Sequence, residues 1–329
     1  DMKVLITWGT GFLGSGIVRR LLERGDAVRV LARHRVEIPN AADVEFVQAD
    51  IQDATKVAAA CQGVDAVIHT AAREGIEPFR KPFYQTNVVG TLNVLEGCRA
   101  AGVSRLVATS SPSVIDAGKS IEGVDETYPY PKKHLSCYAA SKRIAEEMGL
   151  KANSPDLMTC AIRPRLIWGP GDLQLIPRVI ARAKKGKLRQ IGDGTNMIDF
   201  TYIENAVDAH LLALDALRPG SPVPGSAYFI SQGEPVNCWD WLNRVLEMVG
   251  LPPVKKRLSF KFAYWVGALS ELYFFLGGRG REPILTRFLA TQLAYSHWYN
   301  IDKARRELKY EPKVSTEEGV GKLRLWLNG

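Results

Sequence analysis

The feature that most constrains this chain is a glycine-rich turn, TWGTGFLG, at residues 7–14. It directly follows the apolar run Lys3–Thr7 and opens the helical pattern Phe12–Arg24. At such a junction the backbone can approach a phosphate closely, and the helix N-terminus offers unpaired N–H groups and a partial positive charge. A simple tight turn is the alternative, but at the first strand–helix junction the pattern predicts a dinucleotide-binding fold.

Short apolar runs and longer amphipathic runs alternate over the first 165 residues. The short runs are rich in Val, Ile and Leu without strict polar alternation, as in strands buried on both faces. Strand, helix and strand repeated in this way predict an α/β fold with a doubly wound parallel sheet of the Rossmann type. The expected strands are Lys3–Thr7, Ala27–Ala32, Val44–Val47, Ala66–Thr70, Leu106–Thr109 and Met158–Arg163, and the expected helices are Phe12–Arg24, Ala54–Cys61, Phe83–Ala101 and Tyr138–Asn153.

The pattern changes after about Pro164, where helical runs dominate and alternate with loops rich in glycine and proline. Ligands of doubly wound sheets bind at the carboxyl edge of the strands. We therefore expect residues 1–165 to form the dinucleotide-binding core. Residues 166–329 should form a smaller, mainly helical substrate-binding region that is interleaved with this core and closes over its edge.

The segment 260–277, FKFAYWVGALSELYFFLG, is strongly aromatic but contains Lys261 and Glu271. A membrane-spanning helix needs an uninterrupted apolar run of about 18–20 residues, so this segment is not expected to span a bilayer. Two interpretations stay open. The segment is either a core or lid helix, or an apolar helix that borders the entrance for a lipid-like substrate or touches a membrane surface, with Lys261 facing water.

Composition narrows the function classes. The formal net charge of +8 fits either a basic, soluble surface or attraction to anionic ligands or anionic lipid. The Lys and Arg residues are scattered and match no nucleic-acid-binding module, so no nucleic acid partner is expected. The five cysteines fit neither a zinc site nor a disulfide framework, which predicts reduced thiols and no bound metal. The strand-like start predicts a cytoplasmic protein without a secretory signal, and membrane association stays open.

The end of the second expected strand, LARHR at residues 31–35, carries no acidic residue. Sites that prefer NAD place a carboxylate here to bind the ribose hydroxyls. Arg33 can instead bind a 2′-phosphate bidentately, which predicts a preference for NADP(H). NAD(H) and a solvated surface arginine are the alternatives. Further cofactor contacts are expected from residues at or just beyond the ends of the third, fourth and fifth strands: Asp50, Ile51, Thr70, Ala71, Ala72 and Thr109.

Tyr138 and Lys142 stand four residues apart in YAASK, on one face of an expected helix. The lysine ammonium would lower the tyrosine pKa from about 10, which makes the phenol a usable acid or base near neutral pH. The fifth strand ends in TSS, and we expect Ser111 rather than Ser110 to hold the reacting oxygen. The candidate catalytic residues are therefore Ser111, Tyr138 and Lys142.

These motifs, together with RPRLIWGPGD, IGDGTNMIDFTYIENA and AYFISQGEPV, resemble the extended short-chain dehydrogenase/reductases over nearly the whole chain. Within that superfamily the chain resembles the 3β-hydroxysteroid dehydrogenase branch, which includes sterol-4-carboxylate dehydrogenases. The strings RPRLIWGPGDLQLIPR, LTRFLATQL and HWYNIDKARREL are most similar to the bacterial 2-alkyl-3-oxoalkanoate reductases of long-chain olefin biosynthesis. The resemblance implies catalysis by Ser111, Tyr138 and Lys142, and cofactor binding by Gly9, Gly11, Phe12, Leu13, Gly14, Tyr138, Lys142, Pro164 and Leu166.

The resemblance implies an oxidoreductase of lipid metabolism that uses NADPH to reduce the ketone of a long-chain 2-alkyl-3-oxoalkanoate to the 3-hydroxy acid. A 3β-hydroxysteroid or sterol-4-carboxylate 3-dehydrogenase is the first alternative. Sugar-nucleotide epimerisation fits less well, because the aromatic segment suits an apolar substrate. A cofactor-sensing binding protein without turnover is a further alternative. The partners compatible with these interpretations are a long-chain or polycyclic lipid-like substrate, a membrane surface contacted peripherally, and a homodimer or pathway-enzyme complex.

Trp8 departs from the family pattern, which has glycine at this position of the turn. Glycine has no Cβ to clash with the cofactor, and it tolerates backbone angles that are closed to other residues. An indole here either turns outward over the cofactor cleft or lies across the adenosine site. We therefore expect Trp8 to weaken cofactor binding without changing the fold.

Overall fold

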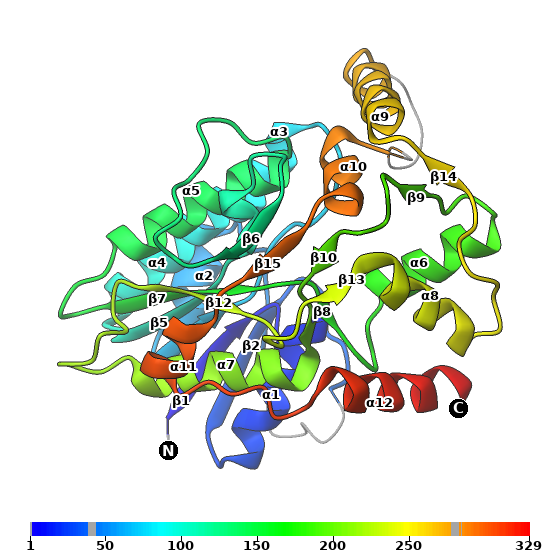
Figure 1. Ribbon diagram of the computed structural model, residues 1–329. Coiled ribbons are helices and arrows are strands. Elements are labelled where there is room, and N and C mark those ends of the chain that lie inside the picture. The colour runs from blue at the N-terminus through cyan, green and yellow to red at the C-terminus, as the bar shows by residue number, and fades with distance from the viewer. Residues whose placement is uncertain (1, 39–43, 278–282, 284) are drawn as a thin grey trace.

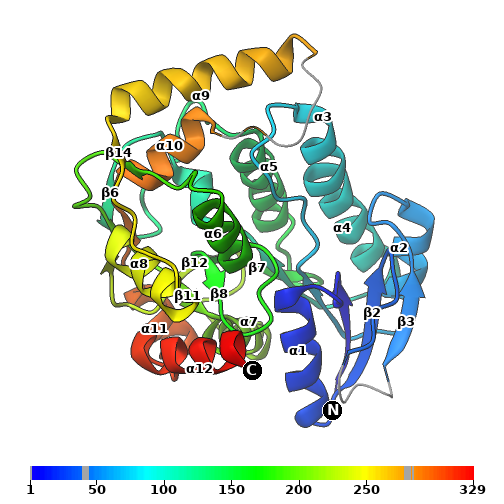
Figure 2. The ribbon, with the colours of Figure 1, turned by 90° about the vertical axis from the view of Figure 1, so that its right-hand side faces the viewer.

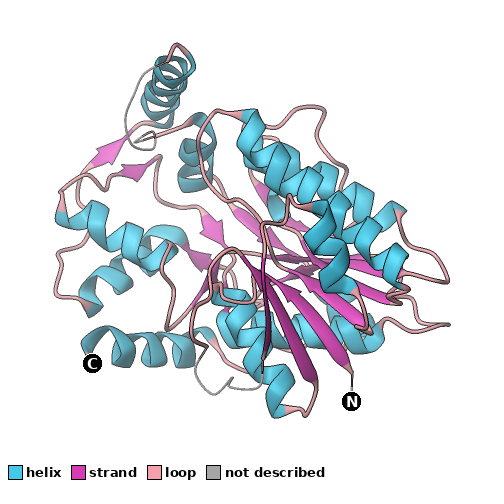
Figure 3. Ribbon diagram, turned by 180° about the vertical axis from the view of Figure 1, so that it is seen from behind, coloured by secondary structure: helices cyan, strands magenta, loops and turns pink. Residues whose placement is uncertain are grey.

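The computed structural model describes residues 2–38, 44–277, 283 and 285–329. Seven parallel strands form a central sheet in the order β12–β7–β5–β4–β1–β2–β3, with helices on both faces (Figures 1 and 3). This arrangement confirms the expected doubly wound Rossmann-type sheet. The strands are β1 Lys3–Thr7, β2 Ala27–Ala32, β3 Glu45–Gln48, β4 Ala66–His69, β5 Arg105–Thr109, β7 Met158–Pro164 and β12 Ala227–Ile230.

The two faces of the sheet bury alternate residues of each strand. In β1, Leu5 packs into the cluster formed with helices α2 (Ala54–Cys61) and α4 (Gly90–Ala101). Its neighbour Ile6 packs into the larger cluster formed with α1 (Phe12–Glu23) and α7 (Ile203–Ala216). Because both faces are covered, the strands need apolar residues at consecutive positions. This explains why the apolar runs in the sequence do not alternate with polar residues.

The expected helix at 83–101 is divided in the structure. A short helix α3, Arg80–Phe83, leads into a π-helical turn, Tyr84–Val89, and only then into α4. The π-helical turn carries the buried Asn87. π-helical turns often occur at functional sites.

Strand β6, Ile121–Val124, and most residues after β7 form a smaller lobe beside the carboxyl edge of the sheet (Figures 1 and 2). Two elements of this part of the chain return to the core, because β12 pairs with β7 and α7 covers the sheet. The lobe contains the small sheet β13–β10–β15–β6 and several helices. Its elements are β6 Ile121–Val124, β8 Ile167–Trp168, α6 Leu175–Lys184, β9 Gln190–Ile191, β10 Met197–Ile198, β11 Thr201–Tyr202, β13 Val236–Asn237, α8 Cys238–Met248, β14 Arg257–Leu258, α9 Phe260–Phe275, α10 Arg287–Ala294, β15 His297–Tyr299, α11 Asp302–Leu308 and α12 Thr316–Asn328.

The aromatic segment forms the single helix α9, which stands out from the body of the molecule (Figure 1, gold). Of the residues of α9, all of which the structure describes, only Ala263 and Gly267 are buried. The interpretation of this segment as a core helix is therefore wrong. Across the described ranges, no helix has both the length and the apolar character required to cross a bilayer.

Candidate active site

Three glycines shape the turn between β1 and α1. A Cβ on Gly14 would lie 2.3 Å from the Trp8 carbonyl oxygen, and a Cβ on Gly9 would lie 2.7 Å from the Val30 side chain. Gly11 is the N-cap of α1, and no side chain of the described residues caps it. Its own N–H donates to the Trp8 carbonyl oxygen at 2.9 Å. The first-turn N–H groups of α1, which begins with Phe12 and Leu13, therefore suit the pyrophosphate of a dinucleotide.

Trp8 lies directly over this turn. Its backbone adopts φ 54°, in the left-handed region that favours glycine. A Cβ on Gly11 would lie 3.1 Å from indole atoms Cδ2 and Cε2, so the ring packs against Gly11. The side chain is 37% exposed. The fold thus tolerates Trp8, and the indole covers part of the phosphate-binding turn.

The carboxyl ends of β1 and β4 are joined by a buried polar cluster that the sequence did not reveal. His69 Nδ1 lies 2.8 Å from Thr7 Oγ1, and its Nε2 lies 3.0 Å from Thr91 Oγ1 on α4. Burial, assisted by the charge of Lys142, lowers the pKa of His69 to about 3, so the ring is neutral. Thr70 Oγ1 donates to the Thr7 carbonyl oxygen at 2.6 Å. The cluster fixes the edge where the cofactor residues were expected.

The other expected cofactor residues are distributed along the same edge. The Asp50 carboxylate accepts from the Gln52 N–H at 2.9 Å in the turn after β3. Arg33 is exposed just beyond β2. The remaining positions are Ile51, which is buried after β3, Ala71 and Ala72, which follow β4 and are half-buried, Thr109 at the end of β5, Pro164 at the end of β7, and Leu166, which has φ 36°.

The expected catalytic residues come together just beyond the carboxyl end of β5 and in the first turns of α5, Cys137–Lys151. Tyr138 and Lys142 lie one turn apart on α5, and the Ser111 side chain hydrogen-bonds Tyr138. The Lys142 ammonium donates to the Thr109 carbonyl oxygen at 2.6 Å. Ser110 lies instead beside Glu146. The structure thus brings Ser111, not Ser110, to the phenol.

The electrostatics of Tyr138 differ from the expectation. Burial is the main cause that raises the pKa of Tyr138 above its usual value, and the negative charge of Glu74 raises it further. The Ser111 hydrogen bond lowers this pKa, but only in part. The expected lowering of the phenol pKa by Lys142 was therefore wrong. Lys142 is buried, and burial lowers its own pKa to about 8. A phenol with a raised pKa keeps its proton at neutral pH and suits the role of a proton donor.

Asn87 is a site residue that sequence reasoning missed. Its Nδ2 donates to Ser141 Oγ at 2.9 Å and to the Arg73 carbonyl oxygen at 3.0 Å, and its Oδ1 accepts from the Arg73 N–H at 2.7 Å. It therefore ties the loop after β4 to the catalytic helix, next to Lys142. The available signal was a lone asparagine within a mostly apolar helical run, TNVVGT.

A buried ion pair fixes the catalytic helix to the sheet. Arg163 of β7 donates to Glu146 of α5 with Nη2–Oε1 at 2.6 Å and Nε–Oε2 at 2.9 Å. Both side chains are almost fully buried. The bidentate pair restricts the position of α5, and hence of Tyr138, relative to the strand ends.

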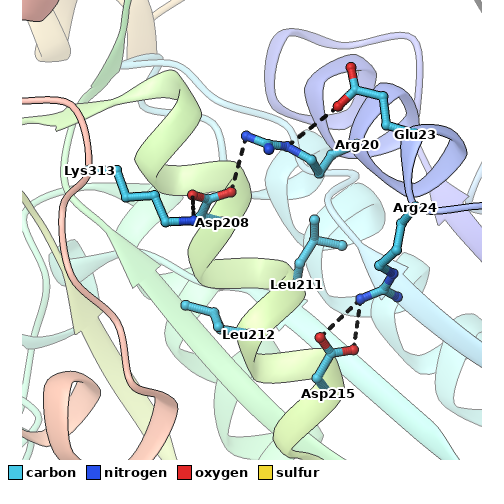
Figure 4. A pocket seen from close by; sticks show the side chains of 8 residues that line it. All are labelled: Arg20, Glu23, Arg24, Asp208, Leu211, Leu212, Asp215 and Lys313. Atoms are coloured by element: carbon cyan, nitrogen blue, oxygen red, sulfur yellow. Dashed lines mark hydrogen bonds and ion pairs between the residues drawn. The ribbon is translucent and has the colours of Figure 1, made fainter.

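A surface pocket between α1 and α7 lies apart from this site (Figure 4). Its charged side chains pair with one another, as in Arg20–Asp208 at 3.3 Å and Arg24–Asp215 at 2.8 Å. It lies toward the C-terminal end of α1, away from the glycine-rich turn. We assign no ligand to it.

Comparison with known proteins places this site in a family. The model of the 3-beta hydroxysteroid dehydrogenase/isomerase family matches residues 5–261. The chain is 48% identical over 326 residues to a 2-alkyl-3-oxoalkanoate reductase of Stenotrophomonas maltophilia, covering 98% of each. It is 36% identical to a 3 beta-hydroxysteroid dehydrogenase/Delta 5→4-isomerase of Mycobacterium tuberculosis, covering 97% of this chain and 88% of that one.

The fold also matches solved structures. The UDP-glucose 4-epimerase of Thermus thermophilus, in complex with NAD, superimposes with a TM-score of 0.75 at 25% identity. The match covers 100% of this chain and 99% of the epimerase. With its sheet and its Ser111–Tyr138–Lys142 cluster, the chain belongs to the 3-beta hydroxysteroid dehydrogenase/isomerase family and is an oxidoreductase acting on hydroxyl or keto groups.

Proposed function

We propose that the chain is an NADP(H)-dependent reductase that converts a long-chain 2-alkyl-3-oxoalkanoate to the 3-hydroxy acid. The observation that carries the proposal is the convergence of Ser111, protonated Tyr138 and Lys142 beside a phosphate-binding turn. The relative that is 48% identical over nearly the whole chain supports this substrate class. The exposed apolar helix α9 supports a lipid-like substrate.

The residues act on the substrate carbonyl in defined roles. The nicotinamide, when bound, supplies a hydride to the carbonyl carbon. The Ser111 hydroxyl donates a hydrogen bond to the carbonyl oxygen, and Tyr138 transfers its proton to the same oxygen. Lys142 is fixed by Thr109, and its other N–H groups are assigned to the nicotinamide ribose. Asn87 acts indirectly, as a positioning residue, by holding Ser141 between the two catalytic side chains.

The direct test compares NADPH oxidation with a 2-alkyl-3-oxo acid and with a 3-keto sterol. We expect turnover of the oxo acid and a loss of at least about 100-fold in kcat for Tyr138→Phe, with nearly unchanged NADPH affinity. Tyr128→Phe, which alters a half-buried tyrosine in the loop after β6, serves as the control. If Tyr138→Phe kept more than about a tenth of the wild-type kcat, the catalytic assignment would fail.

The two alternatives give different results in the same assay. Faster turnover of the sterol would favour the 3β-hydroxysteroid or sterol-4-carboxylate activity, which the similarity to the mycobacterial enzyme supports. Binding of NADPH without turnover of either ketone would favour a cofactor-sensing protein. The covered phosphate-binding turn at Trp8 is the observation that supports this last alternative.

The preference for NADP(H) is proposed from Arg33, which is exposed beyond β2. We expect Arg33→Ala to reduce NADPH affinity more than NADH affinity, because only NADPH carries the 2′-phosphate. Arg19→Ala, at an exposed arginine on α1, is the matched control. Equal affinity for both cofactors in the wild type would contradict the proposal. We further propose a cytoplasmic location, and a homodimer or pathway-enzyme complex remains compatible with the fold.

A further inference from the structure

Helix α9 presents an apolar stripe to solvent. Phe262, Trp265, Val266, Leu269, Leu272 and Tyr273 recur at spacings of three and four residues and are between 38% and 69% exposed. This spacing gives one continuous face of a helix. In a surface helix of a globular protein such a face is turned toward the core, whereas here it is turned away.

The opposite face of α9 holds the helix to the protein. Gly267 packs so closely that a Cβ there would lie 2.6 Å from the backbone N of Arg287 at the start of α10. Arg287 Nη2 lies 2.7 Å from the Glu271 carboxylate, and the Phe260 and Tyr295 rings are 4.7 Å apart. Because the inward side is already packed, the outward stripe is a separate surface.

Basic residues gather at the N-terminal end of the stripe. β14 leads into α9 and pairs with β9, with Arg257 aligned with Gln190. The two segments that enter this pairing, 184–192 and 253–262, contain no acidic residue. They supply seven exposed cations: Lys184, Lys185, Lys187, Lys255, Lys256, Arg257 and Lys261.

We propose that α9 and this basic cluster dock the enzyme on an anionic phospholipid surface, with the helix lying in the plane of the interface. An apolar face with basic residues beside it is the combination that binds such surfaces. Sixteen residues of helix extend about 24 Å at 1.5 Å per residue, which suits a helix lying on a bilayer and is too short to cross one. A second copy of the chain fits less well, because a two-fold contact would bring two surfaces of the same charge together.

The docked orientation would bring the active site toward the lipid. Cys137 immediately precedes Tyr138, and its thiol lies within electrostatic reach of Arg80 on α3 and Glu271 on α9. Helix α9 runs along the upper edge of the molecule in Figure 2, from β14 toward α3. Direct delivery of a lipid-like ketone from the bilayer rests on the proposed function, whereas the docking itself does not.

The test is cosedimentation with phosphatidylcholine vesicles that either contain or lack phosphatidylglycerol. We expect the wild type to pellet with the anionic vesicles only, and added salt to weaken this binding. Leu269→Glu should reduce the partition coefficient at least about tenfold, because it places a charge in the stripe. Leu325→Glu, at a leucine of α12 that is 77% exposed, should bind like the wild type.

The basic cluster is tested in the same assay. Lys255→Glu combined with Lys256→Glu should weaken binding to anionic vesicles, whereas Lys56→Glu on α2 should not. Two results would overturn the proposal: equal pelleting of wild type and Leu269→Glu, or no pelleting of the wild type with anionic vesicles. In the second case, a dimer in light scattering that Leu269→Glu dissociates would show that the stripe binds a second copy of the chain instead. The two leucine variants and the two lysine variants should all still reduce a water-soluble, short-chain 2-alkyl-3-oxo acid. If binding persists but no ketone is reduced, the proposed function fails and the docking stands.

Discussion

Trp8 has two unfavourable effects, one on the backbone conformation of the turn and one on the cofactor site. Its φ of 54° costs about 1 kcal/mol or more for a residue with a Cβ, and its indole occupies space above Gly11. We expect Trp8→Gly to tighten NADPH binding by about 1 kcal/mol or more, roughly tenfold in Kd, as measured by calorimetric titration.

A second variant separates these two effects. Trp8→Ala removes the indole but keeps a Cβ. It should therefore bind NADPH as tightly as Trp8→Gly does, while the backbone strain at this position remains. Trp8→Gly should in addition raise the free energy of unfolding relative to Trp8→Ala. Unchanged NADPH affinity in both variants would show that the indole is accommodated in the bound state.

Asp199 gives a residue-scale prediction about pH. The carboxyl is fully buried after β10, and burial raises its pKa to about 6. Between about pH 4 and pH 6 the folded protein therefore holds a proton that the unfolded chain releases, so folding stability falls as pH rises through this window. Asp199→Asn has no such proton. The difference in the free energy of unfolding between Asp199→Asn and wild type should therefore grow in favour of the variant by about 2–3 kcal/mol from about pH 4 to pH 7, as measured by urea titrations. A constant difference between the two proteins across that range would refute this.

At the scale of elements, the contact between α9 and α10 depends on Gly267. A Cβ there would lie 2.6 Å from both Arg287 N and the Thr286 carbonyl carbon, which are backbone atoms that cannot rotate away. We expect Gly267→Ala to destabilise the protein by about 1–3 kcal/mol and to increase proteolysis near α9.

The matched control for this variant is Gly321→Ala on α12. A Cβ at Gly321 would meet no described atom within 4 Å, and the position is exposed. Alanine should therefore be neutral there, or stabilise by up to about 1 kcal/mol, since it favours a helix more than glycine does. Equal losses at both positions would argue against close packing of α9 on α10.

At the scale of the whole molecule, the central sheet is completed by a distant part of the chain. The edge strand β12 pairs with β7, and α7 covers the apolar face that includes Val107 and Ile162. A fragment of residues 1–165 lacks both elements, so it would expose an unpaired strand edge and a large apolar surface. We expect this fragment to lose cooperative unfolding and near-ultraviolet circular dichroism, with the full chain as the control. A cooperatively folded fragment would support a division of the chain at residue 165.

Local sequence patterns determined the parts of this protein that depend on neighbours along the chain. The consecutive apolar runs and the turn around Gly11 predicted the first six strands of the sheet, the order of helices and the phosphate-binding junction. The spacing of Tyr138 and Lys142 places them on one helical face whatever surrounds that helix. Their placement with Ser111 also followed from the sequence, because parallel strands bring their carboxyl ends to one edge.

Tertiary structure alone decided the features that depend on contacts between distant segments. β12 completes the central sheet by pairing with β7, which aligns Ala227 with Ala161, so the pairing joins segments that are far apart in the chain and no local pattern could show it. The pKa of Tyr138 depends on burial and on Glu74, which lies 64 residues earlier in the chain, so the YAASK spacing could not give its direction. An aromatic sequence such as that of α9 is apolar wherever it lies. Whether it faces a core or solvent is set by what packs against it, and here α10 takes one face and leaves the other open.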